Sequence, residues 1–172
     1  MTEQYGPYGL SYEKEQMRLH NIGLCEQYLA LKGPMRNVER AKFCTDTGAM
    51  ILPFAFGKDP RDNDANRVWK SFKELGEQAE KNGWVGGSYP DWELNNATIY
   101  STPDPDLILI ECDGEGMRYD KARRFNDLGY YKNHYILIVT FVNGKMDDVS
   151  EVFNTACVYN NYENWKREPR MF

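Results

Sequence analysis

Residues 130–154 read YYKNHYILIVTFVNGKMDDVSEVFN. A long apolar run leads into Asn143-Gly144, and a second run follows in which Val149, Glu151 and Phe153 lie at every second residue. Asn-Gly between two such runs is typical of a two-residue β-hairpin turn. The sequence therefore predicts two antiparallel strands, at 130–142 and 145–158.

The position of Glu151 in this hairpin raises the question of its role. Counting from the turn pairs Val142 with Lys145 and places Ile136 opposite Glu151. The predicted face carries His134, Ile136, Ile138, Val149, Glu151 and Phe153. Burial on an apolar face raises the pKa of a carboxyl group, which suits an acid or base that works near neutral pH. The alternative is a structural glutamate paired with His134 or with an arginine, and a bulge between Asp147 and Glu151 would shift the face by one residue.

The remaining chain places helices before strands. Ser11 is a candidate N-cap for the first helix, and Val68, Phe72, Leu75 and Ala79 form an apolar stripe on the third. The predicted helices are 11–32, 34–43 and 65–81, and the further strands are 48–56, 92–101 and 106–116. This order predicts an α+β fold, with the N-terminal helices packed on one face of a cone-shaped, curved antiparallel sheet that encloses a pocket. We expect a flexible arm at 1–10, a single domain at 11–158 and a tail at 159–172.

Composition excludes several classes of function. The formal net charge of −5 argues against a nucleic-acid partner. No leader and no membrane-spanning run is seen, so we expect a cytoplasmic protein without a membrane partner. The cysteines have no metal-site spacing, and Glu111 and Asp113 lack the spacing of a calcium loop, so no metal is predicted. No glycine-rich nucleotide motif is present, and no cofactor is predicted. The four cysteines are Cys25, Cys44, Cys112 and Cys157.

Four stretches carry a resemblance to a known family. They are EQYLALKG (26–33), YPDWELNNATIYSTPDPDLILIECDGEG (89–116), YYKNHY (130–135) and VNGKMDDVSEVFN (142–154). Together they resemble the phenazine-biosynthesis A/B proteins, a family within the nuclear transport factor two-like, or SnoaL-like, superfamily. The matching order covers the chain from about Cys25 to Asn154.

The resemblance implies a fold, a pocket and roles for several residues. The family fold is a cone of bent sheet, usually dimeric, with a ligand pocket inside. The family's acid–base glutamate falls on Glu151, its carboxylate-binding arginine most nearly on Arg40, and its pocket tyrosine on Tyr131. The B-type member of the family promotes condensation of two amino-oxo-cyclohexene carboxylate molecules. The implied ligand is therefore a small cyclic keto or amino carboxylate.

One position departs from the family pattern. The second acid–base residue of the family is a histidine three positions before a Trp-Ser pair. Here Trp84 is retained as a candidate substrate-binding residue, but Lys81 stands in place of the histidine and Val85 in place of the serine. Lys81 is a candidate carboxylate anchor, a candidate imine-forming amine, or a solvated residue at a helix end.

Two hypotheses follow. In the first, the protein is a cofactor-independent enzyme that catalyses acid–base condensation or isomerisation with Glu151. Arg40 or Lys81 holds a carboxylate, and Tyr131 and His134 orient the substrate. In the second, the protein is a non-catalytic small-molecule-binding or dimeric accessory protein that has lost the family histidine.

Overall fold

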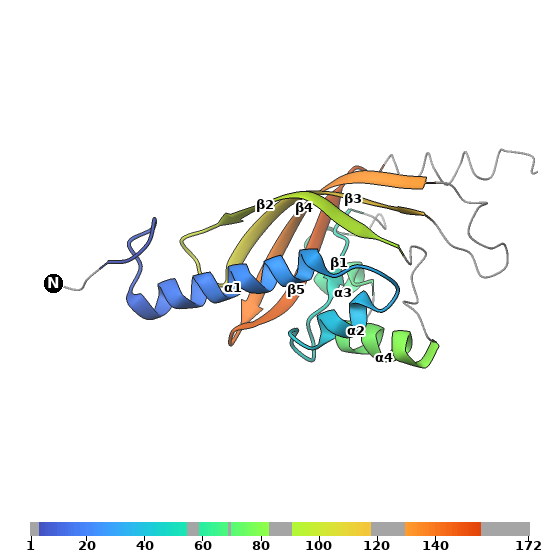
Figure 1. The fold of residues 1–172 in the computed structure, drawn as a ribbon, viewed down its shortest axis with the longest axis horizontal. Coiled ribbons are helices and arrows are strands. Elements are labelled where there is room, and N and C mark those ends of the chain that lie inside the picture. The colour runs from blue at the N-terminus through green and yellow to red at the C-terminus, as the bar shows by residue number, and fades with distance from the viewer. Residues whose placement is uncertain (1–3, 55–58, 69, 83–90, 118–129, 156–172) are drawn as a thin grey trace, which may run out of the picture.

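The fold is a curved sheet with helices on one side (Figure 1). The computed structural model describes residues 4–54, 59–68, 70–82, 91–117 and 130–155. In chain order the elements are α1 (Tyr12–Ala30), α2 (Arg36–Ala41), β1 (Met50–Ile51), α3 (Asn63–Asn66), α4 (Phe72–Asn82), β2 (Glu93–Ser101), β3 (Leu107–Met117), β4 (Tyr130–Val142) and β5 (Lys145–Phe153).

The five strands form one sheet in the order β1-β5-β4-β3-β2. Neighbouring strands are antiparallel except at one edge, where β1 runs parallel to β5. Helices α1, α2 and α4 lie on the same side of the sheet (Figure 1). We call this side the inner face and the opposite side the outer face. The predicted α+β fold is confirmed, although the sheet is not wholly antiparallel.

The helices begin where side-chain caps are available. The Ser11 hydroxyl accepts a hydrogen bond from the backbone N–H of Lys14, as the predicted N-cap requires. The predicted helix at 65–81 is wrong at its start. Asp62 caps the short α3, and a new helix begins at Phe72. The stripe of Phe72, Leu75 and Ala79 is buried as predicted.

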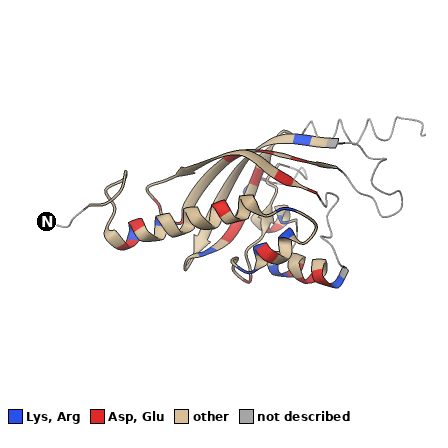
Figure 2. Cartoon of the chain, in the orientation of Figure 1, with Lys and Arg blue, Asp and Glu red and all other residues tan. Residues whose placement is uncertain are grey.

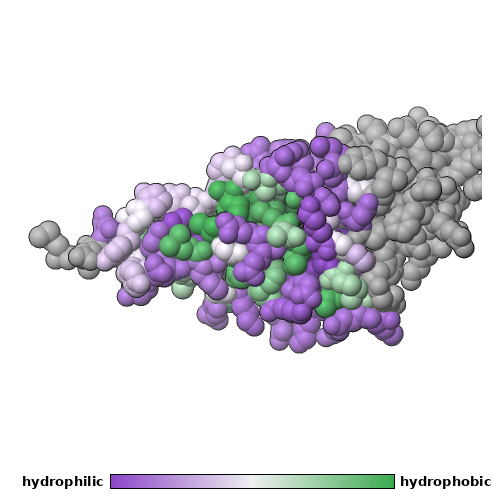
Figure 3. Space-filling view, in the orientation of Figure 1, coloured by the Kyte–Doolittle hydropathy of each residue, from purple (hydrophilic) through white to green (hydrophobic). Residues whose placement is uncertain are grey.

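A single apolar core joins the helices to the inner face. Its helical members include Leu24, Cys25 and Tyr28 of α1 and Phe72 of α4. The strands contribute the alternate residues that point inward, which are Ile108, Ile110, Cys112, Tyr135, Leu137, Val139, Phe141, Met146 and Val149. Figure 3 shows apolar side chains in the middle of the molecule between α1 and the sheet, and Figure 2 shows both signs of charge along the helices.

The hairpin of β4 and β5 departs from its predicted register. Asn143 and Gly144 both have positive φ, and Val142 pairs with Lys145 as predicted. A bulge follows between the Phe141–Met146 and Val139–Val149 pairs, where Asp147 and Asp148 lie opposite one residue of β4. Every later pair is shifted, so Glu151 lies opposite Leu137 and not Ile136. The predicted face that joined Glu151 to His134, Ile136 and Ile138 is therefore wrong.

A second bulge corrects the prediction for β2. In a regular strand at 92–101, Trp92, Leu94, Asn96, Thr98 and Tyr100 would share one face, because they lie at every second position. The register shifts between Asn95 and Thr98, and Asn96 has a φ of 52°. Leu94 is consequently buried, whereas Tyr100 is exposed.

The described part of the N-terminal arm is attached to the domain. Tyr5 and Leu10 exchange two backbone hydrogen bonds of 2.8 and 3.0 Å, and the Tyr8 hydroxyl donates to the carbonyl of Ser101. The flexibility expected for residues 1–10 stays a prediction. The tail at 159–172 lies outside the described residues. No described helix is long and apolar enough to cross a membrane.

Candidate functional site

The bulge in β5 turns Glu151 onto the inner face. Asp148 accepts a hydrogen bond of 3.0 Å from the backbone of Ala49, and its own N–H donates to the Thr140 hydroxyl at 3.2 Å. The Thr45 hydroxyl donates to the carboxylate of Asp147. These contacts come from segments distant in the sequence, and they satisfy the polar groups that the bulge leaves outside the ladder.

Gly48 allows the loop before β1 to approach this bulge. A Cβ atom at this position would overlap the carbonyl oxygen of Asp147. The Gly48 N–H also donates to the Thr45 hydroxyl at 2.8 Å, which places that hydroxyl for its contact with Asp147. The loop and the bulge therefore fit together only because residue 48 has no side chain.

Glu151 is half-buried, lies opposite Leu137 on the inner face, and is close enough to Arg40 and Arg36 for their charges to act on it. In the described part of the chain, no side chain forms a hydrogen bond or ion pair with its carboxylate. Burial raises the pKa of Glu151 to about 7, and the charges of Arg40 and Arg36 oppose this effect only in part. A carboxyl group with this pKa can accept and return a proton near neutral pH.

Both arginines project from the short helix α2. Arg36 and Arg40 are four residues apart, so they lie on one face of the helix, and they are 6% and 3% exposed. Arg36 donates to the carbonyl of Gly33 at 3.1 Å. Burial, and then the charge of Arg40, lowers the pKa of Arg36 to about 10. Two buried cations beside one carboxyl group make this part of the interior suitable for an anion.

Aromatic side chains form a wall further along the inner face. Trp92 stacks on Tyr131 with ring centroids 5.8 Å apart, and its ring meets Tyr135 edge-on at the same distance. The two tyrosine hydroxyls lie 3.1 Å apart, and Asn133 donates to that of Tyr131 at 2.8 Å. Gly114 leaves room for Trp92, since a Cβ there would overlap the indole ring. Tyr131 is thus buried on the inner face.

His134 lies on the outer face, away from Glu151. Its Nδ1 is 3.0 Å from Asp113 Oδ1 and its Nε2 is 3.1 Å from Glu111 Oε1. The hydrogen bond with Asp113, and then that with Glu111, raises the pKa of His134. Glu111 and Asp113 are thus inter-strand partners of His134, since they lie on β3 and His134 lies on β4. The interpretation of His134 as a partner of Glu151 is wrong.

The residues around the family histidine position are only partly described. Lys81 is exposed in the last turn of α4, a position that matches a solvated cation at a helix end. Trp84 lies outside the described residues. No group of three or more potential metal ligands occurs in the described part of the chain.

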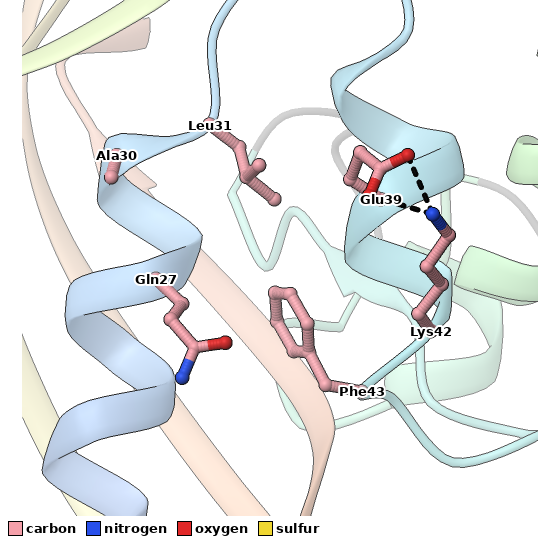
Figure 4. A pocket seen from close by; sticks show the side chains of 6 residues that line it. All are labelled: Gln27, Ala30, Leu31, Glu39, Lys42 and Phe43. Carbon is pink, nitrogen blue, oxygen red and sulfur yellow. Dashed lines mark hydrogen bonds and ion pairs between the residues drawn. The ribbon is translucent and has the colours of Figure 1, made fainter.

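A surface hollow of about 450 Å³ lies between α1 and α2 (Figure 4). Glu39 and Lys42 form an ion pair on its α2 side, with both carboxylate oxygens 2.7 Å from Nζ. None of the candidate site residues lines this hollow. Its lining residues are Gln27, Ala30, Leu31, Glu39, Lys42 and Phe43.

Sequence reasoning missed two residues of this interior. Arg36 could have been found because it precedes Arg40 by one helical turn on the same short helix. Tyr28 stands in the family-like stretch EQYLALKG, but no feature of that stretch assigns it a role in the site. Its position against Arg40 depends on how α1 and α2 pack.

Comparison with known proteins decides the family. The sequence model of phenazine biosynthesis protein A/B matches residues 1–160. The chain belongs to this family. Phenazine biosynthesis protein PhzA1 of Pseudomonas aeruginosa is 30% identical over 140 residues, which cover 81% of this chain and 78% of that protein. Protein PhzB of Pseudomonas fluorescens is 30% identical over 139 residues, with the same coverage of 81% and 78%.

Solved structures show the same fold in this family and beyond it. The crystal structure of a phenazine biosynthesis-related protein, PhzB2 of Pseudomonas aeruginosa, matches with a TM-score of 0.66 and 22% identity. That match covers 93% of this chain and 94% of the other. A nuclear transport factor two-like protein from Burkholderia xenovorans has a TM-score of 0.53 and 10% identity, covering 83% and 95%. These similarities establish a phenazine biosynthesis A/B chain with a cone-type fold.

Proposed function

We propose that this phenazine biosynthesis A/B-like protein binds a small cyclic keto or amino carboxylate in the cone, between the helices and the inner face. We also propose that Glu151 moves a proton on this ligand. The observation that carries the proposal is the inward Glu151, whose pKa of about 7 accompanies two buried arginines. Family membership supports the choice of ligand class.

The proposed roles follow from charge and protonation. Arg40 holds the ligand carboxylate, because a guanidinium group forms charge-assisted hydrogen bonds with carboxylates. Glu151 accepts a proton from the carbon next to the ligand carbonyl and returns it to the same or a neighbouring atom. Tyr131 and Trp92 supply an aromatic wall for a flat ring. This proton movement is common to isomerisation and condensation.

Proton abstraction can be tested without knowing the natural ligand. We would incubate 3-oxocyclohexanecarboxylate with the protein in D₂O and follow loss of the protons next to the ketone by NMR. We expect exchange above the buffer rate for the wild type and for His134→Gln, whose side chain lies on the outer face. Glu151→Gln should lose the exchange and still bind the probe in a thermal-shift assay.

A non-catalytic binding protein is the second candidate. It is favoured by the exposed Lys81 at the position of the family histidine. The same experiment separates the two functions. Wild-type binding without exchange above the buffer rate would support this candidate and remove the enzyme proposal. Absence of binding to the keto carboxylate would remove both.

We also infer a homodimer, as family membership suggests. Two large apolar side chains support it, because Ile136 is 46% and Tyr100 49% exposed on strands that the helices do not cover on the outer face. A sheet face of this kind is suited to packing against a second copy.

A cytoplasmic location is proposed on chemical grounds. Cys25, Cys44 and Cys112 are buried free thiols. A reducing compartment maintains thiols in this state. Fractionation of cells that express the tagged full-length chain would test the location.

A further inference from the structure

The hydroxyl of Tyr28 is buried, and no described residue forms a hydrogen bond with it. Tyr28 lies in α1, and its side chain is 1% exposed. A buried tyrosine hydroxyl usually finds one, because leaving a polar group unpaired in the interior costs free energy. The ring itself is well packed, edge-on to Phe72 with centroids 6.3 Å apart. Packing of the ring explains why the side chain is buried, but it does not explain why residue 28 carries a hydroxyl group.

Arg40 lies beside Tyr28, and its Nε donor is not used by any described residue. Its guanidinium carbon lies 3.9 Å from the centroid of the Tyr28 ring. Nη1 donates to Asn37 Oδ1 at 3.2 Å, and Nη2 to the backbone carbonyl of Tyr28 at 3.5 Å. Nε is buried and has no hydrogen-bond partner among the described residues. Arg40 is thus held in one orientation by three contacts, and it retains a free donor.

The two orphaned groups belong to the same interior as Glu151. The charge of Glu151 acts on both the Tyr28 hydroxyl and the Arg40 guanidinium. Burial raises the pKa of Tyr28 above its usual range, so the phenol stays neutral and keeps its proton. A neutral phenol O–H is suited to donate to a neutral carbonyl, while a guanidinium cation is suited to a carboxylate.

We propose that Tyr28 is a specificity-determining residue whose hydroxyl donates a hydrogen bond to the ring carbonyl of the ligand, next to the carboxylate that Arg40 holds. This inference rests on the proposed function and adds a selection rule to it. A ligand that lacks the carbonyl leaves the Tyr28 hydroxyl unpaired in the complex. The site then distinguishes cyclic keto carboxylates from simple cyclic carboxylates.

The test compares two probes on two proteins. Binding of 3-oxocyclohexanecarboxylate and of cyclohexanecarboxylate would be measured by calorimetry for the wild type and for Tyr28→Phe. We expect the substitution to weaken binding of the keto acid roughly tenfold, the usual effect of one lost hydrogen bond. Binding of cyclohexanecarboxylate should not change. The wild type should prefer the keto acid, and Tyr28→Phe should lose that preference.

A measurement on the free protein tests the premise independently. Because the hydroxyl has no partner, Tyr28→Phe should leave the midpoint of thermal unfolding unchanged or raise it. Tyr135→Phe is the matched control, since its hydroxyl contacts that of Tyr131 and its loss should lower the midpoint. A lowered midpoint for Tyr28→Phe would reveal an internal partner and overturn the inference.

The outcomes separate this inference from the proposed function. Equal keto-acid binding by the wild type and Tyr28→Phe would overturn the role of Tyr28 and leave the proposed function standing. A wild type that binds neither probe would overturn both. A selective loss of keto-acid binding without loss of stability would support both.

Discussion

Glu151 occupies a setting that favours its neutral form. It lies opposite Leu137 on a face that also carries Val149. Arg36 and Arg40 act on it through space, but their effect does not outweigh burial. The carboxyl group therefore exchanges its proton near pH 7, where an ordinary glutamate is fully ionised. The burial that raises the pKa of Glu151 suits it to proton transfer, but it also lowers the free energy of unfolding when the carboxyl group is ionised.

Stability should therefore depend on pH through Glu151. A raised pKa means that the folded state binds the proton more tightly than the unfolded state, so stability falls as pH rises from about 4.5 to about 7. A difference of this size corresponds to roughly 3 kcal/mol at most. Glu151→Gln should match the wild type near pH 4.5 and exceed it in free energy of unfolding above pH 7. Urea titrations from pH 4.5 to 8.5, followed by tryptophan fluorescence, measure this.

The difference between the two proteins isolates Glu151. The pKa of His134 is also shifted on folding, upward through its hydrogen bond with Asp113, but both proteins retain this residue, so its contribution cancels. Parallel stability curves for the wild type and Glu151→Gln would contradict the burial of an ionisable group at this position.

At the scale of elements, the decisive feature is the fit between the loop before β1 and the bulge of β5. Two residues of β5, Asp147 and Asp148, lie opposite a single residue of β4. The loop at 45–49 forms hydrogen bonds with the side chains of both. The bulge reverses which residues of β5 face the helices beyond it. The loop therefore positions Glu151, although it lies about a hundred residues earlier in the sequence.

Gly48→Ala should disturb this fit. The new methyl group would overlap the Asp147 carbonyl, and forced overlaps of this kind cost about 1–3 kcal/mol. The free energy of unfolding in urea would show the loss. Gly23→Ala is the control, because a methyl group there meets nothing within 4 Å inside helix α1. It should be neutral or stabilise the helix by up to about 1 kcal/mol. Equal changes in the free energy of unfolding for the two substitutions would show that the loop does not pack closely against the bulge.

At the scale of the whole molecule, the helices of the described part of the chain cover only one face of the sheet. Helices α1, α2 and α4 all lie on the inner side (Figure 1). The outer side carries both charged and apolar side chains. His134 lies there between the carboxylates of Glu111 and Asp113, and the exposed Ile136 follows two residues later on β4. The two proposals therefore concern different faces: the inner face for the proposed ligand and the outer face for the proposed second subunit.

Ile136→Lys should convert the proposed dimer into a monomer. A charge at this place would have to be desolvated against the second copy. Size-exclusion chromatography with light scattering would give the mass. Leu19→Lys is the matched control, since Leu19 is 48% exposed on α1 and should leave the mass unchanged. A monomeric wild type, or a dimeric Ile136→Lys, would contradict the outer-face interface.

Much of the fold could be predicted from local patterns. The cap at Ser11, the Asn143-Gly144 turn and the apolar run of β4 each act within a few residues, so they are visible in the sequence. The start of α4 was missed, because the apolar stripe begins at Val68, which lies in the segment between α3 and α4. The roles of Arg36 and Tyr28 were missed because they depend on contacts between helices.

The sequence alone determined the class of fold, since periodicity and turn residues specify which segments are helices and strands. It also determined the family, through motifs spread along the chain. Only the tertiary structure decided which side of the sheet Glu151 faces. Alternation along a strand has a period of two, so one extra residue at Asp147 and Asp148 reverses every later side chain. That extra residue is accommodated by Thr45, Gly48 and Ala49, whose contacts with it exist only once the chain has folded.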